Sequence, residues 1–250
     1  MELAGSREIQ VWAVELQASE SSFSRCCAWL SGDEQVRAAR FHFDQHARAY
    51  VLGRAVLRAL LGGILGLPPA GIQFCYGPKG KPALADSGSL LRFNTSNSGN
   101  LAVYAFTEGC ELGIDVEALR PIPDMEQIAA RFFAPEEAAE LMALAEPDRP
   151  QAFFNCWTRK EAYIKAVGDG LSVQLASFRV TLRPGARPEM LDLKGSAGAA
   201  QAWTLEHFVP ADGFVGALAY RDQRRPLRIR PLLTAEALLG GESIDFYRAV

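Results

Sequence analysis

The segment Gly113–Glu117 carries two carboxylates, Asp115 and Glu117, within an otherwise apolar stretch. Alternate side chains of a β-strand point to opposite faces, so the two carboxylates share one face and the apolar side chains share the other. Two carboxylates on one face repel each other unless they are solvated or bridged by a cation, and Mg²⁺ prefers carboxylate and phosphate oxygens. The segment therefore predicts either a Mg²⁺–phosphate site or a half-exposed strand whose polar side faces water.

A second candidate site lies on a predicted helix over residues 151–167, where Glu161 and Lys165 stand four residues apart. At about 100° per residue, Phe153 and Trp157 belong to an apolar stripe, and Glu161 falls at its margin. A surface Glu–Lys pair more often lies opposite the apolar face. The spacing predicts a semi-buried carboxylate and ammonium with shifted pKa values. The alternative is a lysine that extends to solvent beside a hydrated glutamate.

Cations and hydroxyls gather in the first half of the chain. Lys79 and Lys81 belong to a turn over residues 77–82, and Ser96 and Asn97 to a polar stretch over residues 94–99. Arg37 and Arg48 belong to two predicted helices. A lysine ammonium is a natural partner of phosphate, and the alternative for the turn over residues 77–82 is an ordinary surface loop. The polar stretch is predicted as a turn that either binds a ligand or caps itself. For the arginines, the alternative is a solvated helix face.

These residues must be positioned by two similar sets of elements. The first half predicts, in order, a strand at 11–16, a helix from the capping box Ser31–Glu34, a helix at 46–65, and strands at 72–76, 91–94 and 101–106. The second half predicts a strand at 112–116, helices at 125–132, 135–145 and 151–167, and strands at 178–182, 202–208 and 214–220. The repeated order predicts an α/β chain of two halves, 1–110 and 111–226, followed by a packing tail, 227–250.

The composition is that of an ordinary globular protein, with 250 residues, 49% hydrophobic and 22% charged. The formal net charge of −3 argues against a general nucleic-acid binder. Five cysteines are too sparse for a disulfide scaffold. The first residues lack the pattern of a signal peptide, and the most apolar stretch is much shorter than a membrane span. We therefore expect a cytoplasmic protein that does not bind membranes.

Four blocks in this order resemble the Sfp-type 4′-phosphopantetheinyl transferases. The blocks are Gly80–Pro82, Phe93–Ser98, Gly113–Glu117 and Trp157–Lys165, with Arg131–Glu137 as a further match. The resemblance implies two pseudo-twofold-related halves, each a small, mostly antiparallel sheet packed with helices, and an active site at their interface. It also implies that the enzyme moves the phosphopantetheine arm of coenzyme A onto a serine of an apo acyl or peptidyl carrier domain. The second product is adenosine 3′,5′-bisphosphate.

The resemblance implies a role for each matching residue. Asp115, Glu117 and Glu161 would ligate Mg²⁺, and Glu161 would also be the base for the carrier serine, directly or through a metal-bound water. Lys165 would hold the diphosphate, and Asp115, Glu161 and Lys165 form the expected catalytic set. The expected coenzyme A contacts are Arg37, Arg48, Lys79, Lys81, Ser96, Asn97, Asp115 and Lys165. The enzyme would be a monomer that contains its own dimer-like interface and serves fatty-acid, polyketide or nonribosomal peptide biosynthesis.

One position departs from the family pattern, because Asn97 stands where the family usually has histidine. Asparagine donates and accepts hydrogen bonds but is never cationic, so a phosphate contact there loses its charge assistance. A non-catalytic relative that binds coenzyme A or carrier domains is therefore the alternative function. A Mg²⁺-dependent phosphohydrolase is a weaker one. The arginine-rich run 221–230 is either a docking patch for an acidic carrier or a solvated edge.

Overall fold

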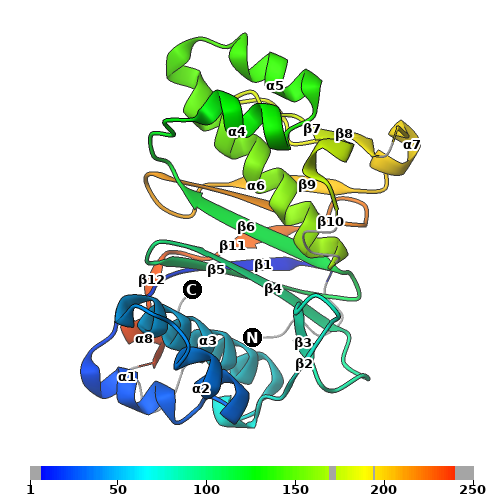
Figure 1. The fold of residues 1–250 in the computed structure, drawn as a ribbon. Helices are drawn as coiled ribbons and strands as arrows, with labels where there is room; N and C mark the ends of the chain where they lie inside the picture. Colours follow the sequence, from blue (N-terminus) through cyan, green and yellow to red (C-terminus); the bar gives the residue numbers. More distant parts are fainter. Residues whose placement is uncertain (1–6, 169–172, 194, 240–250) are drawn as a thin grey trace.

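Two β-sheets face each other across the middle of the molecule, and each is covered on its outer side by helices (Figure 1). The fold is a computed structural model that describes residues 7–168, 173–193 and 195–239. Strand alternation explains the layers, because each buried strand has one face toward the facing sheet and one toward its helices. The predicted α/β fold of two similar halves with small, mostly antiparallel sheets is confirmed.

The first half places its helices on one side of a five-stranded sheet with the path β11-β1-β5-β4, in which β12 also pairs with β1. Its strands before residue 110 are β1 Ile9–Glu15, β2 Phe74–Tyr76, β3 Pro82–Leu84, β4 Leu91–Ser98 and β5 Leu101–Glu108. Its helices are α1 Glu20–Cys27, α2 Gly32–Ala38, α3 Asp44–Leu65 and the short 3₁₀ turn Pro69–Gly71. Strands β2 and β3 form a separate two-stranded hairpin.

The second half is built around the three-stranded sheet β6-β10-β9. Its strands are β6 Leu112–Ala118, β7 Phe178–Val180, β8 Met190–Leu193, β9 Thr204–Phe208 and β10 Phe214–Tyr220. Its helices are α4 Met125–Phe132, α5 Pro135–Met142, α6 Arg149–Val167, α7 Ala197–Ala200 and the 3₁₀ turns Glu146–Asp148 and Leu175–Ser177. Strands β7 and β8 form a second small hairpin. Within the described residues, every helix is too short or too polar to traverse a lipid bilayer.

An apolar core lies between the two sheets and joins the halves. Its first-sheet members come from β1 and β5: Ile9, Val11, Ala13, Leu101, Val103 and Ala105. Its second-sheet members come from β6, β9 and β10, together with Cys110: Leu112, Ile114, Val116, Phe208, Leu218 and Tyr220. All of these side chains are buried. Burial of this much apolar surface stabilises the two sheets as one unit.

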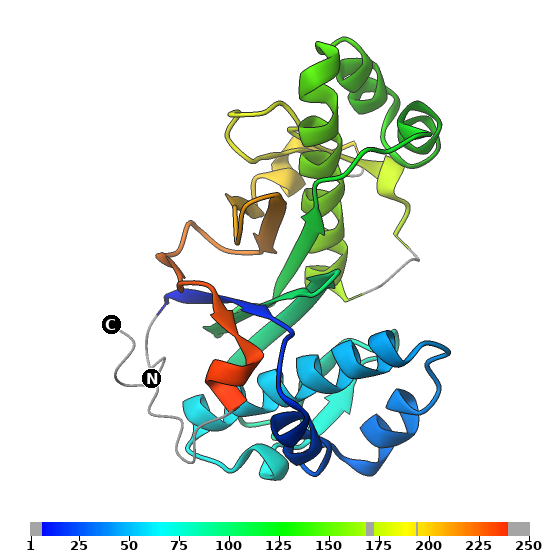
Figure 2. The ribbon, with the colours of Figure 1, turned by 90° about the vertical axis from the view of Figure 1, so that its left-hand side faces the viewer.

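The chain returns to the first half after β10. Strands β11 Leu227–Ile229 and β12 Leu233–Thr234 pair in parallel with β1, and helix α8 Ala235–Leu239 packs against α3. Figure 2 shows this orange-red segment beside blue β1 and the helices of the first half. The predicted packing tail thus extends the first sheet in its described part, 227–239. The division of the chain at 110 and 226 stays a prediction.

The structure corrects the prediction for residues 94–99. The stretch expected to be a turn is strand, because β4 runs to Ser98 and pairs with β5 over its whole length. Only Gly99, with φ +60°, and Asn100 turn the chain. The predicted elements lack helices α1, α7 and α8 and strands β3, β8, β11 and β12. Each is short, so its apolar pattern spans too few residues to be distinct.

Candidate active site

Strands β4 and β6, at neighbouring edges of the two sheets, are joined by side chains. Asn94 Oδ1 accepts a hydrogen bond from the backbone N–H of Ile114 at 3.0 Å. Ser98 Oγ accepts one from the backbone N–H of Ala118 at 3.1 Å. Because alternate residues of a strand share a face, Asn94, Ser96 and Ser98 all point toward β6. The polar pattern that resembles a turn in the sequence therefore bridges two sheets.

Ser96, Asp115 and Lys165 meet at the centre of this junction. Asp115 Oδ1 accepts from Ser96 Oγ at 2.8 Å and from Lys165 Nζ at 2.6 Å. Lys165 Nζ also donates to Ser96 Oγ at 2.7 Å. Asp115 is 5% exposed, and this burial raises the pKa of its carboxyl, while Lys165 and Ser96 act to lower it. Three residues predicted from separate motifs thus form one contact cluster.

Gly113 permits helix α6 to lie directly on β6. A Cβ at this position would stand 2.1 Å from the carbonyl oxygen of Ala162 and 2.3 Å from the backbone nitrogen of Ala166. Both atoms belong to the helix backbone, which cannot move aside as a flexible side chain can. Only glycine leaves room for this approach. The approach brings Lys165, on the same turn as these atoms, within reach of Asp115.

Glu161 and Glu117 add negative charge to the same region. Glu117 Oε2 accepts from Ser98 Oγ at 2.9 Å and from Arg120 Nη1 at 3.2 Å. Glu161 is half-buried, and burial raises its pKa first, followed by the charges of Asp115 and Glu117. Lys165 opposes this rise. The three predicted metal ligands are therefore near enough to repel one another.

The carboxylates suit Mg²⁺ in chemistry, because that ion prefers hard oxygen donors. Asp115 Oδ2 is buried and has no hydrogen-bond partner among the described residues, so one ligand atom is available. In the described part of the chain, however, no group of three or more His, Cys, Asp or Glu side chains is arranged as a metal cage. Asp115, Glu117 and Glu161 stay predicted ligands.

A cavity of about 840 Å³ adjoins this junction in the first half. Four predicted coenzyme A contacts line it: Arg37, Arg48, Ser96 and Asn97. The Arg37 guanidinium lies 5.4 Å from the Tyr50 ring centroid. Arg48 pairs with Glu20 at 2.8 Å and donates to the Ala18 carbonyl at 2.7 Å. Ser96 also belongs to the cluster with Asp115 and Lys165, so it links the cavity to the carboxylates.

Lys79 and Lys81 are not among the described residues that line this cavity. Lys79 is exposed on the turn between β2 and β3. Lys81 Nζ donates to Glu111 Oε2 at 2.9 Å, to the Ala166 carbonyl at 3.0 Å and to the Leu112 carbonyl at 3.2 Å. A cation at the carboxyl end of a helix interacts favourably with the helix dipole. Lys81 thus ties the β2–β3 hairpin to the second half at the end of α6.

Several residues near the cavity escape the sequence prediction. Tyr76 and Arg54 line it, and Arg54 contacts the buried carboxylate of Glu34. The sequence signal was present in part, because Glu34 is the acidic member of the predicted capping box. Its side chain does accept from the Ser31 backbone N–H at 2.9 Å. The charge pairing with Arg54, twenty residues away, has no local signal.

Three arginines of the run 221–230 pair with carboxylates of the protein, and a docking role for the run stays a prediction. Arg224 pairs with Glu206, and buried Arg225 pairs with Asp222 at 2.7 Å and donates to the Glu108 carbonyl at 2.7 Å. Arg228 pairs with Glu8 at 3.2 Å. These contacts fasten β10 and β11 to their surroundings, so most of this charge is neutralised within the protein.

Comparison with known proteins identifies the family. A model described as 4′-phosphopantetheinyl transferase superfamily matches residues 111–219, and one described as 4′-phosphopantetheinyl transferase, N-terminal, matches residues 14–108. The 4′-phosphopantetheinyl transferase HetI of Nostoc sp. is 42% identical over 216 residues, which cover 86% of this chain and 88% of that protein.

Two further relatives carry the same activity in their names. The 4′-phosphopantetheinyl transferase Sfp of Bacillus subtilis is 32% identical over 164 residues, 66% of this chain and 71% of that one. The human L-aminoadipate-semialdehyde dehydrogenase-phosphopantetheinyl transferase is 30% identical over 165 residues, 62% of this chain and 53% of that one. The resemblance inferred from the four sequence blocks is confirmed. The chain belongs to the 4′-phosphopantetheinyl transferase superfamily and is a 4′-phosphopantetheinyl transferase.

Proposed function

We propose that coenzyme A places its nucleotide end in the 840 Å³ cavity and its diphosphate at the junction of β4 and β6. The observation that supports this placement is the position of Ser96, which lines the cavity and also contacts Asp115 and Lys165. The 3′-phosphate and the diphosphate of coenzyme A are its anionic groups, and they would lie along the path from Arg37 and Arg48 to Lys165. The phosphopantetheine arm would then leave the cavity beside Glu161.

In the proposed reaction, the carrier serine oxygen forms a bond to the phosphorus that bears the pantetheine arm. The bond between this phosphorus and the bridging diphosphate oxygen breaks, and adenosine 3′,5′-bisphosphate leaves with that oxygen. Glu161 takes the serine proton at its carboxylate. Lys165 stabilises the negative charge that develops on the leaving phosphate. Asp115 and Ser96 hold the Lys165 ammonium in place through the contacts at 2.6 and 2.7 Å.

The serine transfer itself is tested by mass spectrometry. Apo carrier proteins from fatty-acid, polyketide and peptide synthases are incubated with the enzyme and coenzyme A. We expect at least one carrier to gain the mass of the phosphopantetheine arm on its serine. A wild-type protein that binds coenzyme A but modifies none of them would instead be a binding protein, and release of free phosphopantetheine without a carrier would indicate a hydrolase. Relative kcat/KM values across the panel identify the preferred carrier class.

We propose that the enzyme uses Mg²⁺ and that Asp115, Glu117 and Glu161 hold this ion. When bound there, Mg²⁺ would supply positive charge that offsets the negative charge on the phosphoryl oxygens. Chelation with EDTA is expected to lower kcat by at least about 10²-fold, and excess Mg²⁺ to restore it. Initial rates measured across an EDTA and Mg²⁺ series check this. A rate that persists in EDTA, with protein shown by elemental analysis to be metal-free, would contradict the assignment.

Substitution of Arg37 tests the cavity. Arg37→Ala is expected to raise the KM for coenzyme A about tenfold with kcat within about twofold, because a charge-assisted contact to phosphate contributes to binding. The KM for the carrier should not change. Arg187→Ala, at an exposed arginine of the second half that does not line the cavity, is the matched control. Equal KM values for coenzyme A in wild type and Arg37→Ala would place the nucleotide elsewhere.

We further propose that the two halves act as one cytoplasmic monomer, with units 1–110 and 111–226 and a tail from 227. The apolar core between the sheets supports this, since each half alone would expose that surface to water. The five free cysteines fit a reducing compartment. The mass of the enzyme measured by light scattering in solution tests the monomer.

A further inference from the structure

Glu34 is a completely buried carboxylate that is shared by two arginines of helix α3. Its Oε1 accepts from Arg54 Nε at 2.5 Å, and its Oε2 accepts from Arg58 Nε at 2.8 Å. Burial by itself raises the pKa of Glu34, but Arg54, the Ser31 amide and Arg58 together lower it below its ordinary value. The carboxylate is therefore ionised at neutral pH and joins α2 to α3.

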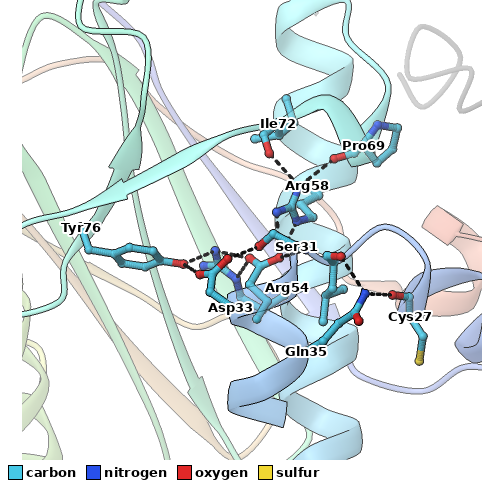
Figure 3. A network of polar contacts seen from close by, with 11 residues as sticks. Cys27, Ser31, Asp33, Gln35, Arg54, Arg58, Pro69, Ile72 and Tyr76 are labelled. Carbon is cyan, nitrogen blue, oxygen red and sulfur yellow. Dashed lines mark hydrogen bonds and ion pairs between the residues drawn. The ribbon is translucent and has the colours of Figure 1, made fainter. Parts of the chain in front are cut away.

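Arg54 continues this network to the β2–β3 hairpin. Its Nη2 donates to the Tyr76 hydroxyl at 3.2 Å, and its guanidinium lies 4.3 Å from the Phe74 ring centroid. The Tyr76 hydroxyl in turn donates to Asp33 Oδ2 at 3.5 Å. Figure 3 shows Tyr76 reaching from the hairpin toward Asp33 and Arg54. Two helices and one hairpin are thus connected at a single group of polar side chains.

The hairpin forms part of the cavity wall. Tyr76, Gly80 and Pro82 line the cavity, together with Arg54 and, from α2, Arg37. Strands β2 and β3 have only three residues each, and a two-stranded hairpin of this size has little stability of its own. Its position therefore depends on contacts with the rest of the protein, and the Arg54–Tyr76 contact lies on its cavity side.

We propose that Glu34 is a positioning residue for the nucleotide cavity, which acts by holding Arg54 against Tyr76 and so fixing the hairpin wall. This inference rests on the proposed placement of the coenzyme A nucleotide in that cavity. Loss of the Glu34 charge and loss of the hairpin position would change the affinity for an anion in opposite directions. Loss of the Glu34 charge makes the cavity more positive, which by itself would tighten the binding of an anion. Loss of the hairpin position would weaken it.

Glu34→Gln separates these effects because it keeps the side-chain shape and removes the charge. The probe is adenosine 3′,5′-bisphosphate, whose Kd is measured by calorimetry, together with the KM for coenzyme A. We expect both to rise about five- to tenfold, with kcat at saturating coenzyme A within about twofold of wild type. A Kd that is unchanged or lower would overturn the inference.

Glu137→Gln is the matched control. Glu137 is the corresponding buried capping-box carboxylate of the second half, accepts from the Ala134 backbone N–H at 2.9 Å and pairs with Lys160 at 2.7 Å. It does not line the cavity. Its substitution should lower the melting temperature without raising the Kd for the bisphosphate. If both variants raised that Kd equally, Glu34 would have only a general structural role, and the inference would be wrong.

Tyr76→Phe tests the same connection without removing a buried charge, in case Glu34→Gln does not fold. It should raise the Kd about two- to fivefold, and its effect should not add to that of Glu34→Gln if both act through the hairpin. If Tyr76→Phe bound the bisphosphate with the same Kd as wild type, the inference about Glu34 would be overturned, while the cavity assignment would stand. If wild type did not bind the bisphosphate, or Arg37→Ala did not weaken it, the cavity assignment would fail as well.

Discussion

Glu161→Gln is expected to lower kcat/KM by about 10²- to 10⁴-fold, the usual contribution of a general base, while the protein stays as stable or becomes more stable. The pKa of Glu161 is raised by burial and by the charges of Asp115 and Glu117. Because the pKa of Glu161 is higher in the folded state than in the unfolded state, its ionised carboxylate lowers the stability of the protein once the pH exceeds the pKa of the unfolded state. Glutamine removes this charge and its repulsion, so function and stability should change in opposite directions.

The two measurements are steady-state kinetics with an apo carrier and thermal unfolding in metal-free buffer. Metal-free conditions matter because a bound cation would stabilise the wild type and reverse the comparison. Glu146→Gln, at an exposed position of a 3₁₀ turn, is the control and should leave both quantities near their wild-type values. A melting temperature that fell together with the activity would assign Glu161 to the folding of α6 rather than to the reaction.

Gly113→Ala is expected to destabilise the protein by about 3 kcal/mol, because the added methyl group overlaps with backbone atoms of α6 that cannot rotate away. For a chain of this size, the melting temperature would fall by about 6–12 °C. Activity should fall further than stability explains. A shift of α6 would carry Lys165 away from Asp115, whose present contact is 2.6 Å.

Gly32→Ala is the matched control for this substitution. A Cβ at Gly32, in helix α2, would meet no atom within 4 Å. Alanine is the better helix former, so stability should be unchanged or slightly higher. If Gly113→Ala unfolded at the same temperature as wild type and kept full activity, the close approach of α6 to β6 would not be what positions Lys165.

Local patterns were sufficient for much of the fold. The alternation in Leu112–Val116 predicted β6, and the apolar stripe with Phe153 and Trp157 predicted helix α6, because these periods are properties of a few neighbouring residues. The prediction of a turn over residues 94–99 was wrong for a physical reason. Asparagine and serine favour turns when they bond to their own backbone. Here their side chains bond to β6 instead, and that strand lies outside any local window.

In the candidate site too, some features follow from local sequence and others depend on tertiary packing. Residue types and spacing were enough to place Asp115 and Glu117 on one strand face, and Glu161 and Lys165 one turn apart on a helix, since both relations follow from backbone geometry. The packing of segments that are distant in the sequence determines which charged side chains pair with each other. Lys165 meets Asp115, Lys81 binds the end of α6 outside the cavity, and Arg54 meets Glu34. These pairings arise from the docking of two sheets and their helices, and no sequence period records them.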